Sequence, residues 1–266
     1  MHKINNQEIG VIDPQITAIV GQKAQGKSSV LINIIENYKK QCEKVGRTFC
    51  CLIDCATDSE AFTNYETISL EELQNLPSIY QAETPFEGVL VVPFDADYDY
   101  QKRLSIIYGA SFNCYLILDE AGTWFTPNLK ASYQKIFAEH RNRGIELYFN
   151  CHGLTEIPKK VRKHVNRIIY FITGEYFPDF NSFARLGFPY PVQLWDVVNA
   201  VNGTPQKNKL PDRPTIQPYS IWDKSKYVVY EDDSNTKKVG KKTTKKVEKP
   251  SVRAKKKQIV EFLKKK

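Results

Sequence analysis

One eight-residue stretch constrains this chain more than any other: Gly21-Gln22-Lys23-Ala24-Gln25-Gly26-Lys27-Ser28. It matches the pattern G-x-x-x-x-G-K-[ST], follows an apolar run over 15–20 and precedes a segment of helical periodicity over 28–44. Glycines let consecutive backbone N–H groups turn towards phosphate oxygens, and the positive end of the following helix faces the same anion. The pattern therefore predicts a phosphate-binding loop between a buried strand and a helix.

The chemistry of such a loop assigns roles to its side chains. The Lys27 ammonium is expected to reach the β and γ phosphates of a nucleotide, and the Ser28 hydroxyl is expected to bind Mg²⁺. The predicted cofactors are thus ATP and Mg²⁺. The predicted nucleotide-binding residues are Gly21, Gln22, Lys23, Ala24, Gln25, Gly26, Lys27, Ser28 and Ser29.

A second motif, "CYLILDE" over 114–120, places two acids directly after an apolar run. At the carboxyl end of a parallel strand, Asp119 is expected to hold the water shell of the metal, together with Ser28. Glu120 is expected to act as the general base that polarises the attacking water. This adjacent acid pair favours hydrolysis over transfer of a phosphoryl group to a small molecule. Two further acids at strand ends, Asp54 and Asp95, are weaker candidates for this part of the site and are otherwise interpreted as solvated loop acids.

The remaining pattern predicts an α/β fold with a mostly parallel central sheet flanked by helices. Helical segments are predicted over 28–44 and 129–143, between short apolar runs that do not alternate strictly with polar residues. This strand–helix alternation is typical of a doubly wound domain. The predicted strands are 15–20, 47–54, 88–95, 114–120, 145–151 and 167–174.

Composition divides the chain into a domain and a tail. The formal net charge of +8 comes from residues 237–266, which hold 14 Lys/Arg against two acids, while the rest of the chain is net acidic. Low apolar content and dense lysine predict a disordered basic tail. The predicted organisation is an ATPase domain over 1–230, with its core over 14–174 and an aromatic, proline-rich extension over 175–230, followed by the Lys-rich tail over 231–266. One short strand is expected to close the domain near 228–231.

Several features indicate where a chain like this resides. A run of about 18 uninterrupted apolar residues would predict a transmembrane segment, and the sequence has no such run. Its first ten residues do not resemble a secretory signal. Its six cysteines lack paired metal-ligand spacings and are interpreted as buried thiols in a reducing compartment. The expected location is the cytoplasm.

Further motifs follow the acid pair. Arg141 and Arg143 precede a strand with Asn150 and His152 at its far end, and the basic segment "VRKHVNRIIYF" over 161–171 comes next. This order of motifs resembles the HerA–FtsK superfamily of nucleic-acid-pumping ATPases. Viral genome-packaging ATPases are the most similar members, and the Zot-like ATPases of filamentous phages are near relatives. The resemblance extends over about residues 14–174 and implies a P-loop NTPase fold of the RecA-like (ASCE) type.

The resemblance also implies an intersubunit site. Arg141 or Arg143 would be an arginine finger that acts on the nucleotide of a neighbouring copy, which implies a homo-oligomeric ring, a hexamer. The alternative is that both arginines are surface charges at a helix end. Where the family typically has Thr-Gln, this chain has Cys151 and His152, so either His152 or Asn150 would sense the γ-phosphate.

The function implied by the resemblance is translocation of double-stranded DNA, without sequence specificity, into a preformed viral capsid. Further implied partners are a capsid or portal-vertex protein, and the location is the host-cell cytoplasm or the virion. The basic tail would tether DNA, dock on an acidic capsid surface or contact anionic lipids, or else would only aid solubility. One alternative is a Zot-like ATPase that assembles or extrudes phage at the membrane. A second is a P-loop switch or kinase that is not a motor.

Overall fold

The computed structural model describes residues 14–57, 59–96, 99–123, 125, 131–189, 191–202 and 228–231, without the side chains of 101, 131–133, 193, 200 and 228–231. The predicted basic tail and most of the predicted extension beyond Asn202 lie outside the described residues. The limits of the two predicted domains stay predictions for that reason.

A single sheet of eight strands organises the described residues, in the order β3-β4-β2-β5-β6-β1-β7-β8. Neighbouring strands from β3 to β7 run parallel, and β8 runs antiparallel to β7. The strands are β1 (Ile16–Val20), β2 (Cys50–Cys55), β3 (Glu66–Thr67), β4 (Gly88–Val92), β5 (Tyr115–Asp119), β6 (Glu146–Cys151), β7 (Arg167–Tyr170) and β8 (Val228–Glu231).

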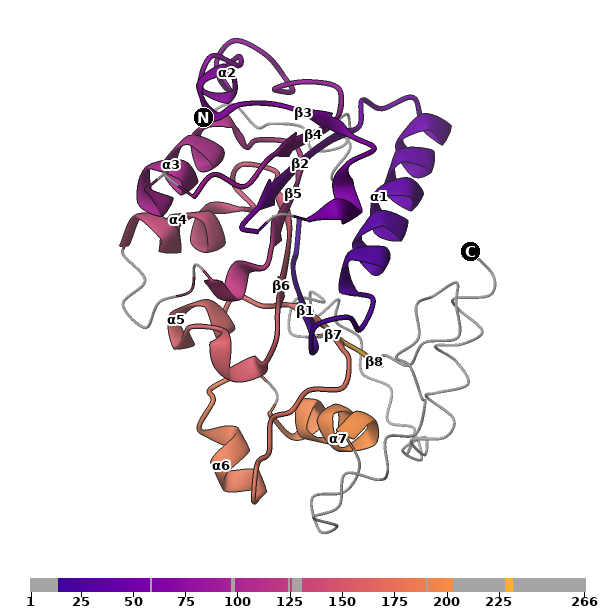
Figure 1. The fold of residues 1–266 in the computed structure, drawn as a ribbon, viewed down its shortest axis with the longest axis vertical. Helices are drawn as coiled ribbons and strands as arrows, with labels where there is room; N and C mark the ends of the chain where they lie inside the picture. Colours follow the sequence, from indigo (N-terminus) through magenta and orange to yellow (C-terminus); the bar gives the residue numbers. More distant parts are fainter. Residues whose placement is uncertain are drawn as a thin grey trace, which may run out of the picture. The chain divides into compact units, whose positions relative to one another are not determined.

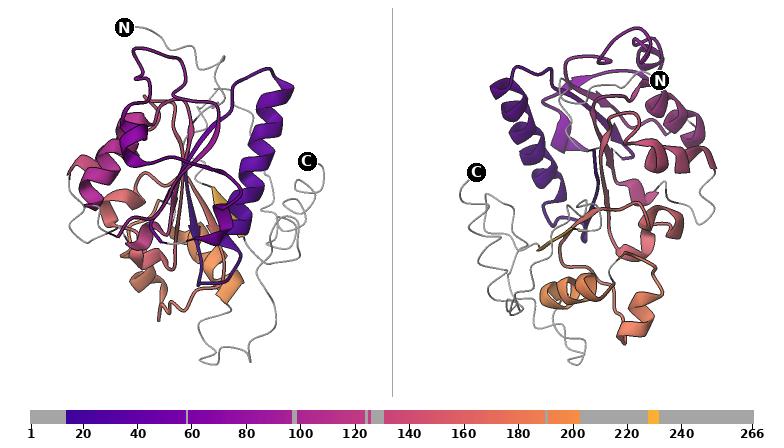
Figure 2. Two further views of the ribbon diagram at one scale, coloured as in Figure 1. Left: turned by 45° about the horizontal axis from the view of Figure 1, so that its top comes forward. Right: turned by 180° about the vertical axis from the view of Figure 1, so that it is seen from behind.

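Helices lie on both faces of this sheet. Helix α1 covers one face, whereas α3 and α4 lie on the other (Figures 1 and 2). The helices are α1 (Lys27–Lys44), α2 (Leu70–Gln74), α3 (Tyr100–Ala110), α4 (Ala131–Glu139), α5 (Lys159–Arg162), α6 (Phe180–Ala184) and α7 (Pro191–Asn202). The structure thus confirms the predicted α/β fold with a mostly parallel sheet between helical layers.

The central strands are buried because both of their faces are covered. All five residues of β1 are buried. Ile16 and Val20 join the core on the α3–α4 side, and Ile19 joins the core under α1. Since successive side chains of a strand point to opposite faces, burial on both sides requires an almost continuous apolar run rather than an alternating one. This explains why the strand pattern of the sequence lacks strict alternation.

The strand order decides which loops meet. Strand β6 lies between β1 and β5, so the carboxyl end of β6 separates the phosphate-binding loop after β1 from the acid pair after β5. The ends of β1, β6 and β5 therefore form one edge of the sheet, where ligands of parallel α/β proteins bind.

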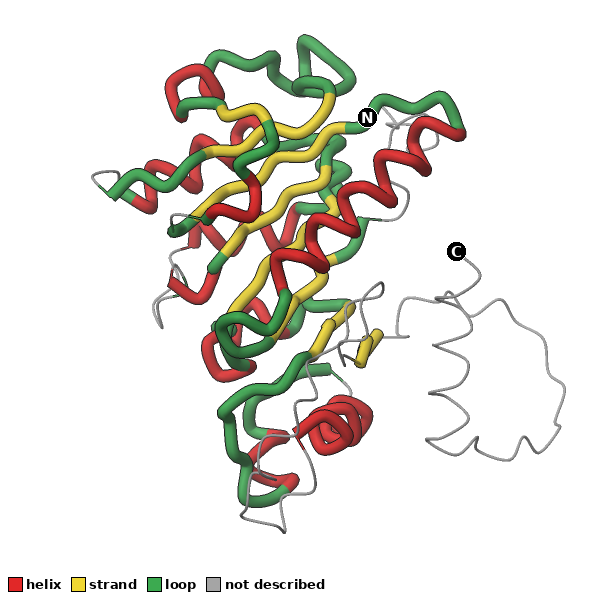
Figure 3. The backbone as a smooth tube through the Cα atoms, turned by 45° about the vertical axis from the view of Figure 1, so that its right-hand side comes forward, coloured by secondary structure: helices red, strands yellow, loops and turns green. Residues whose placement is uncertain are grey.

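The segment after β7 is more regular than its sequence indicates. The aromatic, proline-rich stretch contains α6 and α7, although it has no clear helical period (Figure 3). Phe183 packs against Phe177 and Trp195, with ring centroids 5.2 and 5.1 Å away. Aromatic packing of this kind stabilises short helices whose residues have too little helix propensity to form them alone. The extension also contacts the chain that follows β7, where the Asn202 side chain accepts a hydrogen bond from the Thr173 N–H.

Two further expectations can be compared with the structure. All six cysteines are buried thiols, as expected of structural cysteines. Burial raises the pKa of the Cys55 thiol to about 12, which keeps it protonated. No helix among the described residues is long and apolar enough to cross a membrane.

Candidate phosphate-binding and hydrolysis site

The loop between β1 and α1 has the backbone of a phosphate cradle. Gly26 has a φ of 84° at the start of α1, and Ala24 also has a positive φ, of 62°. This left-handed conformation is natural for glycine and uncommon for alanine, so the loop is held in its shape by its surroundings. At Gly21 a Cβ atom would lie 2.6 Å from the Cβ of Phe171, so a side chain there would collide with β7's continuation. The glycines of the motif therefore serve both the turn and the packing.

Lys27 lies inside this loop. Its side chain is 5% exposed, and its ammonium donates hydrogen bonds to the carbonyls of Gly21 at 2.7 Å and Gln22 at 3.0 Å. Burial lowers the pKa of Lys27, while the nearby carboxylate of Glu120 acts in the opposite direction. Two loop carbonyls thus hold the ammonium inside the loop, where an anion that enters the loop would meet it.

The acid at the end of β5 is fixed by an amide from the neighbouring strand. Asp119 is 2% exposed, and its carboxylate accepts a hydrogen bond from the side-chain amide of Asn150. The carbonyl oxygen of the same amide accepts the backbone N–H of Glu120. Asn150 is itself fully buried on β6. It therefore connects both members of the acid pair and fixes the orientation of the carboxylate.

Glu120 has an unusual backbone conformation and a histidine partner. Its φ of 56° is left-handed, and the Thr123 N–H and hydroxyl both donate to its carbonyl, at 3.0 and 2.8 Å. The Glu120 carboxylate lies 2.9 Å from Nε2 of His152, and Nδ1 of the same ring lies 3.4 Å from the Lys27 ammonium. Strained residues of this kind concentrate at functional sites. The ring of His152 thus joins the two predicted catalytic groups.

The groups around Asp119 suit a hard divalent cation. Burial raises the pKa of Asp119, and the charge of Glu120 adds to that effect, so a cation beside the carboxylate would relieve both. Carboxylate and hydroxyl oxygens, as in Asp119 and Ser28, are the ligands that Mg²⁺ prefers. Within the part of the chain that the structure describes, no three His, Cys, Asp or Glu side chains form a metal site by themselves.

A buried ion pair supports the site from the side of β2. Arg103 on α3 donates to one oxygen of Asp54 through Nε at 2.8 Å and through Nη2, and the side chains are 2% and 0% exposed. The other Asp54 oxygen has no hydrogen-bond partner among the described residues. Burial raises the pKa of Asp54 to about 7, against the opposing effect of Arg103. The interpretation of Asp54 as a solvated loop acid is therefore wrong, whereas Asp95 is exposed as expected.

This ion pair also reaches the acid-pair strand. The Nη2 of Arg103 donates to the carbonyls of Cys55 and Pro93, and the Ala56 N–H donates to the carbonyl of Asp119 at 3.3 Å. The guanidinium thereby holds the chain that follows β2 beside the end of β5. The sequence contains no signal for this pairing, because Asp54 and Arg103 are 49 positions apart.

The two predicted finger arginines do not join the site of their own chain. They lie in the turn before β6, at the amino ends of the strands, while the phosphate loop lies at the carboxyl ends. Arg143 donates to the carbonyls of Ser111 and Gly109 at 2.9 and 3.0 Å and lies over the ring of Tyr108. Arg141 is exposed. Arg143 therefore binds carbonyls of its own chain, whereas the side chain of Arg141 is exposed to solvent.

The loop that carries His152 depends on two carboxylates that sequence patterns do not single out. Glu156 accepts the backbone N–H of His152 at 2.7 Å, and Glu175 accepts the backbone N–H groups of Leu154 and Thr155, both at 2.7 Å. Both acids replace backbone partners that an irregular loop cannot supply. They fix the position of His152 relative to Glu120.

The basic segment after this loop is only partly available to a ligand. Arg162 is 8% exposed and donates to the carbonyls of Ile157, Thr155 and Leu186. Lys159, Lys160 and Lys163 are exposed. The buried guanidinium therefore ties α5 to its neighbouring turns, and the exposed basic surface of this segment is smaller than its sequence indicates.

Comparison with known proteins finds solved structures of similar fold but no matching sequence family. No family model matches the chain, and no curated protein matches it. Its fold is similar to that of the genome packaging NTPase B204 from Sulfolobus turreted icosahedral virus 2 in complex with ATP-gammaS, at 19% identity and a TM-score of 0.56, over 84% of this chain and 94% of that one. The complex with AMPPCP matches at 18% identity and a TM-score of 0.55 over the same shares.

A further solved structure has a similar fold. The DNA-packaging ATPase B204 from Sulfolobus Turreted Icosahedral Virus matches at 16% identity and a TM-score of 0.51, over 83% of this chain and 94% of that one. At such identities the likeness is one of fold. It confirms the P-loop NTPase fold that the resemblance to packaging ATPases implies.

Proposed function

We propose that this chain is an ATP-hydrolysing DNA translocase that packages a viral genome into a preformed capsid. The observation that carries the proposal is the contact chain from Lys27 through His152 to Glu120, on a fold similar to that of a genome packaging NTPase. A cation that can bind phosphate and a carboxylate that can orient water are groups that phosphoryl transfer to water uses.

Each residue of the site has a part in this reaction. The loop from Gly21 to Ser28 and the Lys27 ammonium bind the phosphates, and Ser28 and Asp119 would hold Mg²⁺. The metal would neutralise charge on the β and γ phosphates. Glu120 takes a proton from the attacking water as the oxygen of that water approaches the γ-phosphorus. His152, at 2.9 Å from that carboxylate, orients it and senses the γ-phosphate.

A ring of identical subunits, most simply a hexamer, would complete the site. Arg141 is the better candidate for a finger, since it is exposed and lies away from the phosphate loop of its own chain, while Arg143 is bound to carbonyls. An arginine supplied by a neighbour stabilises the charge of the transition state. The ring would act on double-stranded DNA in the host-cell cytoplasm, with a capsid or portal-vertex protein as docking partner.

One assay tests the proposal. We expect ATP hydrolysis that depends on Mg²⁺, that double-stranded DNA of unrelated sequences stimulates, and that Lys27→Ala abolishes. Hydrolysis that DNA leaves unchanged would contradict the translocase and favour the switch or kinase interpretation. Stimulation by anionic vesicles instead of DNA would favour a Zot-like assembly ATPase. Native mass measurement with a non-hydrolysable ATP analogue tests the ring, and a strict monomer would contradict it.

Replacement of Asn150 by alanine is expected to weaken metal use. The carboxylate of Asp119 and the backbone of Glu120 would both lose the amide that holds them. Loss of a group that orients a metal ligand typically costs about 10–100-fold in metal affinity or activity. A Mg²⁺ titration of ATP hydrolysis should show this, with Asn75→Ala, an exposed change at the end of α2, as the matched control. An unchanged Mg²⁺ midpoint and rate would assign Asn150 a purely structural role.

A further inference from the structure

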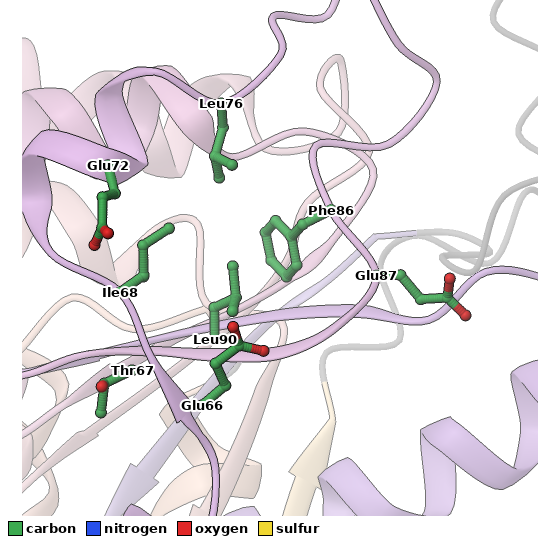
Figure 4. A pocket seen from close by; sticks show the side chains of 8 residues that line it. All are labelled: Glu66, Thr67, Ile68, Glu72, Leu76, Phe86, Glu87 and Leu90. Atoms are coloured by element: carbon green, nitrogen blue, oxygen red, sulfur yellow. The ribbon is translucent and has the colours of Figure 1, made fainter.

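A pocket lies at the β3–β4 edge of the sheet, several strands away from the phosphate-binding loop. Its volume of about 340 Å³ is much larger than the ~30 Å³ share of one water molecule. Figure 4 shows four apolar side chains gathered in it, from β4, from the turn before β4 and from the chain on either side of α2. These four form the floor of the pocket: Ile68, Leu76, Phe86 and Leu90.

The rim of the pocket is negatively charged. Its carboxylates are all exposed, and none of the residues that line the pocket is basic; the three are Glu66, Glu72 and Glu87. The Ser69 N–H and hydroxyl both donate to the carboxylate of Glu72, which lowers its pKa and keeps it charged. From position 48 to position 101 the sequence has eleven acidic residues and no lysine or arginine. A ligand must therefore bring positive charge to this rim, and a nucleic acid would be repelled.

The sheet itself ends beside the pocket. Within the described ranges, β3 pairs with β4 and with no other strand, and its two residues Glu66 and Thr67 are exposed. A strand at the edge of a sheet presents backbone N–H and C=O groups, to which an extended peptide can add. Alternate side chains of an added strand would face the floor of the pocket. An apolar floor, an acidic rim and an open strand edge together favour a basic peptide as the ligand.

We propose that this pocket binds an extended segment of a partner protein, in which two apolar side chains at alternate positions lie between lysines or arginines. The apolar side chains would occupy the floor, and the cations would meet the rim. Five strand spacings of about 4.8 Å, roughly 24 Å, separate β3 from β1 and its phosphate loop. Binding of such a segment therefore leaves the nucleotide site open, and it does not depend on the proposed ATPase activity.

Fluorescence anisotropy with the full chain, without nucleotide, tests the site. The first probe is a labelled peptide, Lys-Lys-Ile-Thr-Phe-Lys-Lys, and the second has serine in place of its Ile and Phe and so keeps every charge. We expect the first peptide to bind at least about tenfold more tightly, because only its side chains can be buried on the floor. Its binding should weaken in 1 M NaCl, where the screening length is about 3 Å. Equal affinities for the two peptides, or no saturable binding of the first, would overturn the proposal.

Two pairs of substitutions locate the bound peptide. Glu66→Gln with Glu87→Gln removes two exposed rim charges and is expected to weaken binding of the first peptide about fivefold. Asp179→Asn with Asp196→Asn removes two exposed charges on α6 and α7 and should leave the affinity unchanged. Asparagine at 179 can still accept the Ser182 N–H that caps α6. Equal weakening by both pairs would overturn the proposal.

Hydrogen exchange provides a second measurement of the location. The unlabelled first peptide is expected to slow backbone exchange in wild-type residues 64–68, which contain β3, because an added strand pairs with that edge. Exchange in α1, which lies under the other core of the sheet, should stay as it is without peptide. Protection confined to segments other than β3 and the lining residues would overturn the proposal.

Discussion

Replacement of Glu120 by glutamine is expected to slow ATP hydrolysis by about 10²–10⁴-fold, the usual contribution of a general base. Glutamine keeps the size of the side chain but cannot take a proton from water. The left-handed backbone at this position and the Asn150 contact to its N–H stay intact, so the site should keep its shape. Nucleotide affinity should therefore change little. Phosphate release measures the rate, and calorimetric titration with an ATP analogue measures the affinity.

Two further variants make this result specific. Lys27→Ala should lose nucleotide binding as well as hydrolysis, because the buried ammonium is the loop's own cation for phosphate. Glu43→Gln, an exposed change in the last turn of α1, alters the same kind of side chain away from the site and should leave both quantities unchanged. Hydrolysis by Glu120→Gln within about threefold of wild type would mean that another group activates the water.

The Arg103→Met variant is expected to lose about 3–5 kcal/mol of unfolding free energy at pH 8.5. Methionine leaves the fully buried Asp54 carboxylate without the cation that pairs with it, and the carbonyls of Cys55, Val92 and Pro93 also lose a donor. Such a loss costs more than the pair contributes, since it leaves an uncompensated buried charge. Urea unfolding measures the difference.

The same variant should be less destabilised at low pH. Burial already raises the pKa of Asp54 to about 7, and loss of the guanidinium raises it further, far above the value of about 3.9 in the unfolded chain. The folded variant then binds more protons than the unfolded chain, so its stability falls as pH rises through that window. Above pH 7 the difference from wild type should grow by about 1.4 kcal/mol per pH unit, which makes it roughly 2 kcal/mol smaller at pH 6 than at pH 8.5.

A double variant provides the control. Asp54→Leu combined with Arg103→Met removes both charges and should recover most of the stability, because an apolar pair can replace a buried ion pair at little cost. It should also lose the pH dependence above pH 7. A loss of stability that is the same at pH 6 and pH 8.5 for Arg103→Met would show that the carboxyl of Asp54 is not the group responsible.

Much of the fold follows from local pattern. The strands were predictable because burial on both faces demands apolar runs, and the structure places β5 at 115–119 within the predicted 114–120. Helix α1 was predictable from the spacing of Val30, Ile34, Ile35, Tyr38 and Cys42, which belong to the core under α1 or pack against it. Helices α6 and α7 were not predictable from the sequence. They are stabilised by aromatic contacts such as that between Phe183 and Trp195, and such contacts leave no periodic pattern in the sequence.

In the predicted site, too, some features follow from local sequence pattern and others from tertiary contacts. Lys27, Glu120 and His152 meet as the motif order indicates, since the parallel sheet brings the ends of β1, β5 and β6 to one edge. The sequence left open whether Asn150 or His152 senses the γ-phosphate. The burial of Asn150 between Asp119 and the Glu120 backbone favours a supporting role, and the exposed ring of His152 is the better placed sensor.

The sequence by itself determined the phosphate loop, the acid pair and the α/β class, because each depends on residues that are neighbours in the chain. Only the tertiary structure decided which polar groups are used internally. Arg143 binds carbonyls of another helix, Asp54 pairs with Arg103 across 49 positions, and Asn150 reaches Asp119 across 31. A charged or amide side chain looks the same in a sequence whether it faces solvent, ligand or a buried partner. The free energy of burial distinguishes these cases, and it depends on contacts that exist only once the chain is folded.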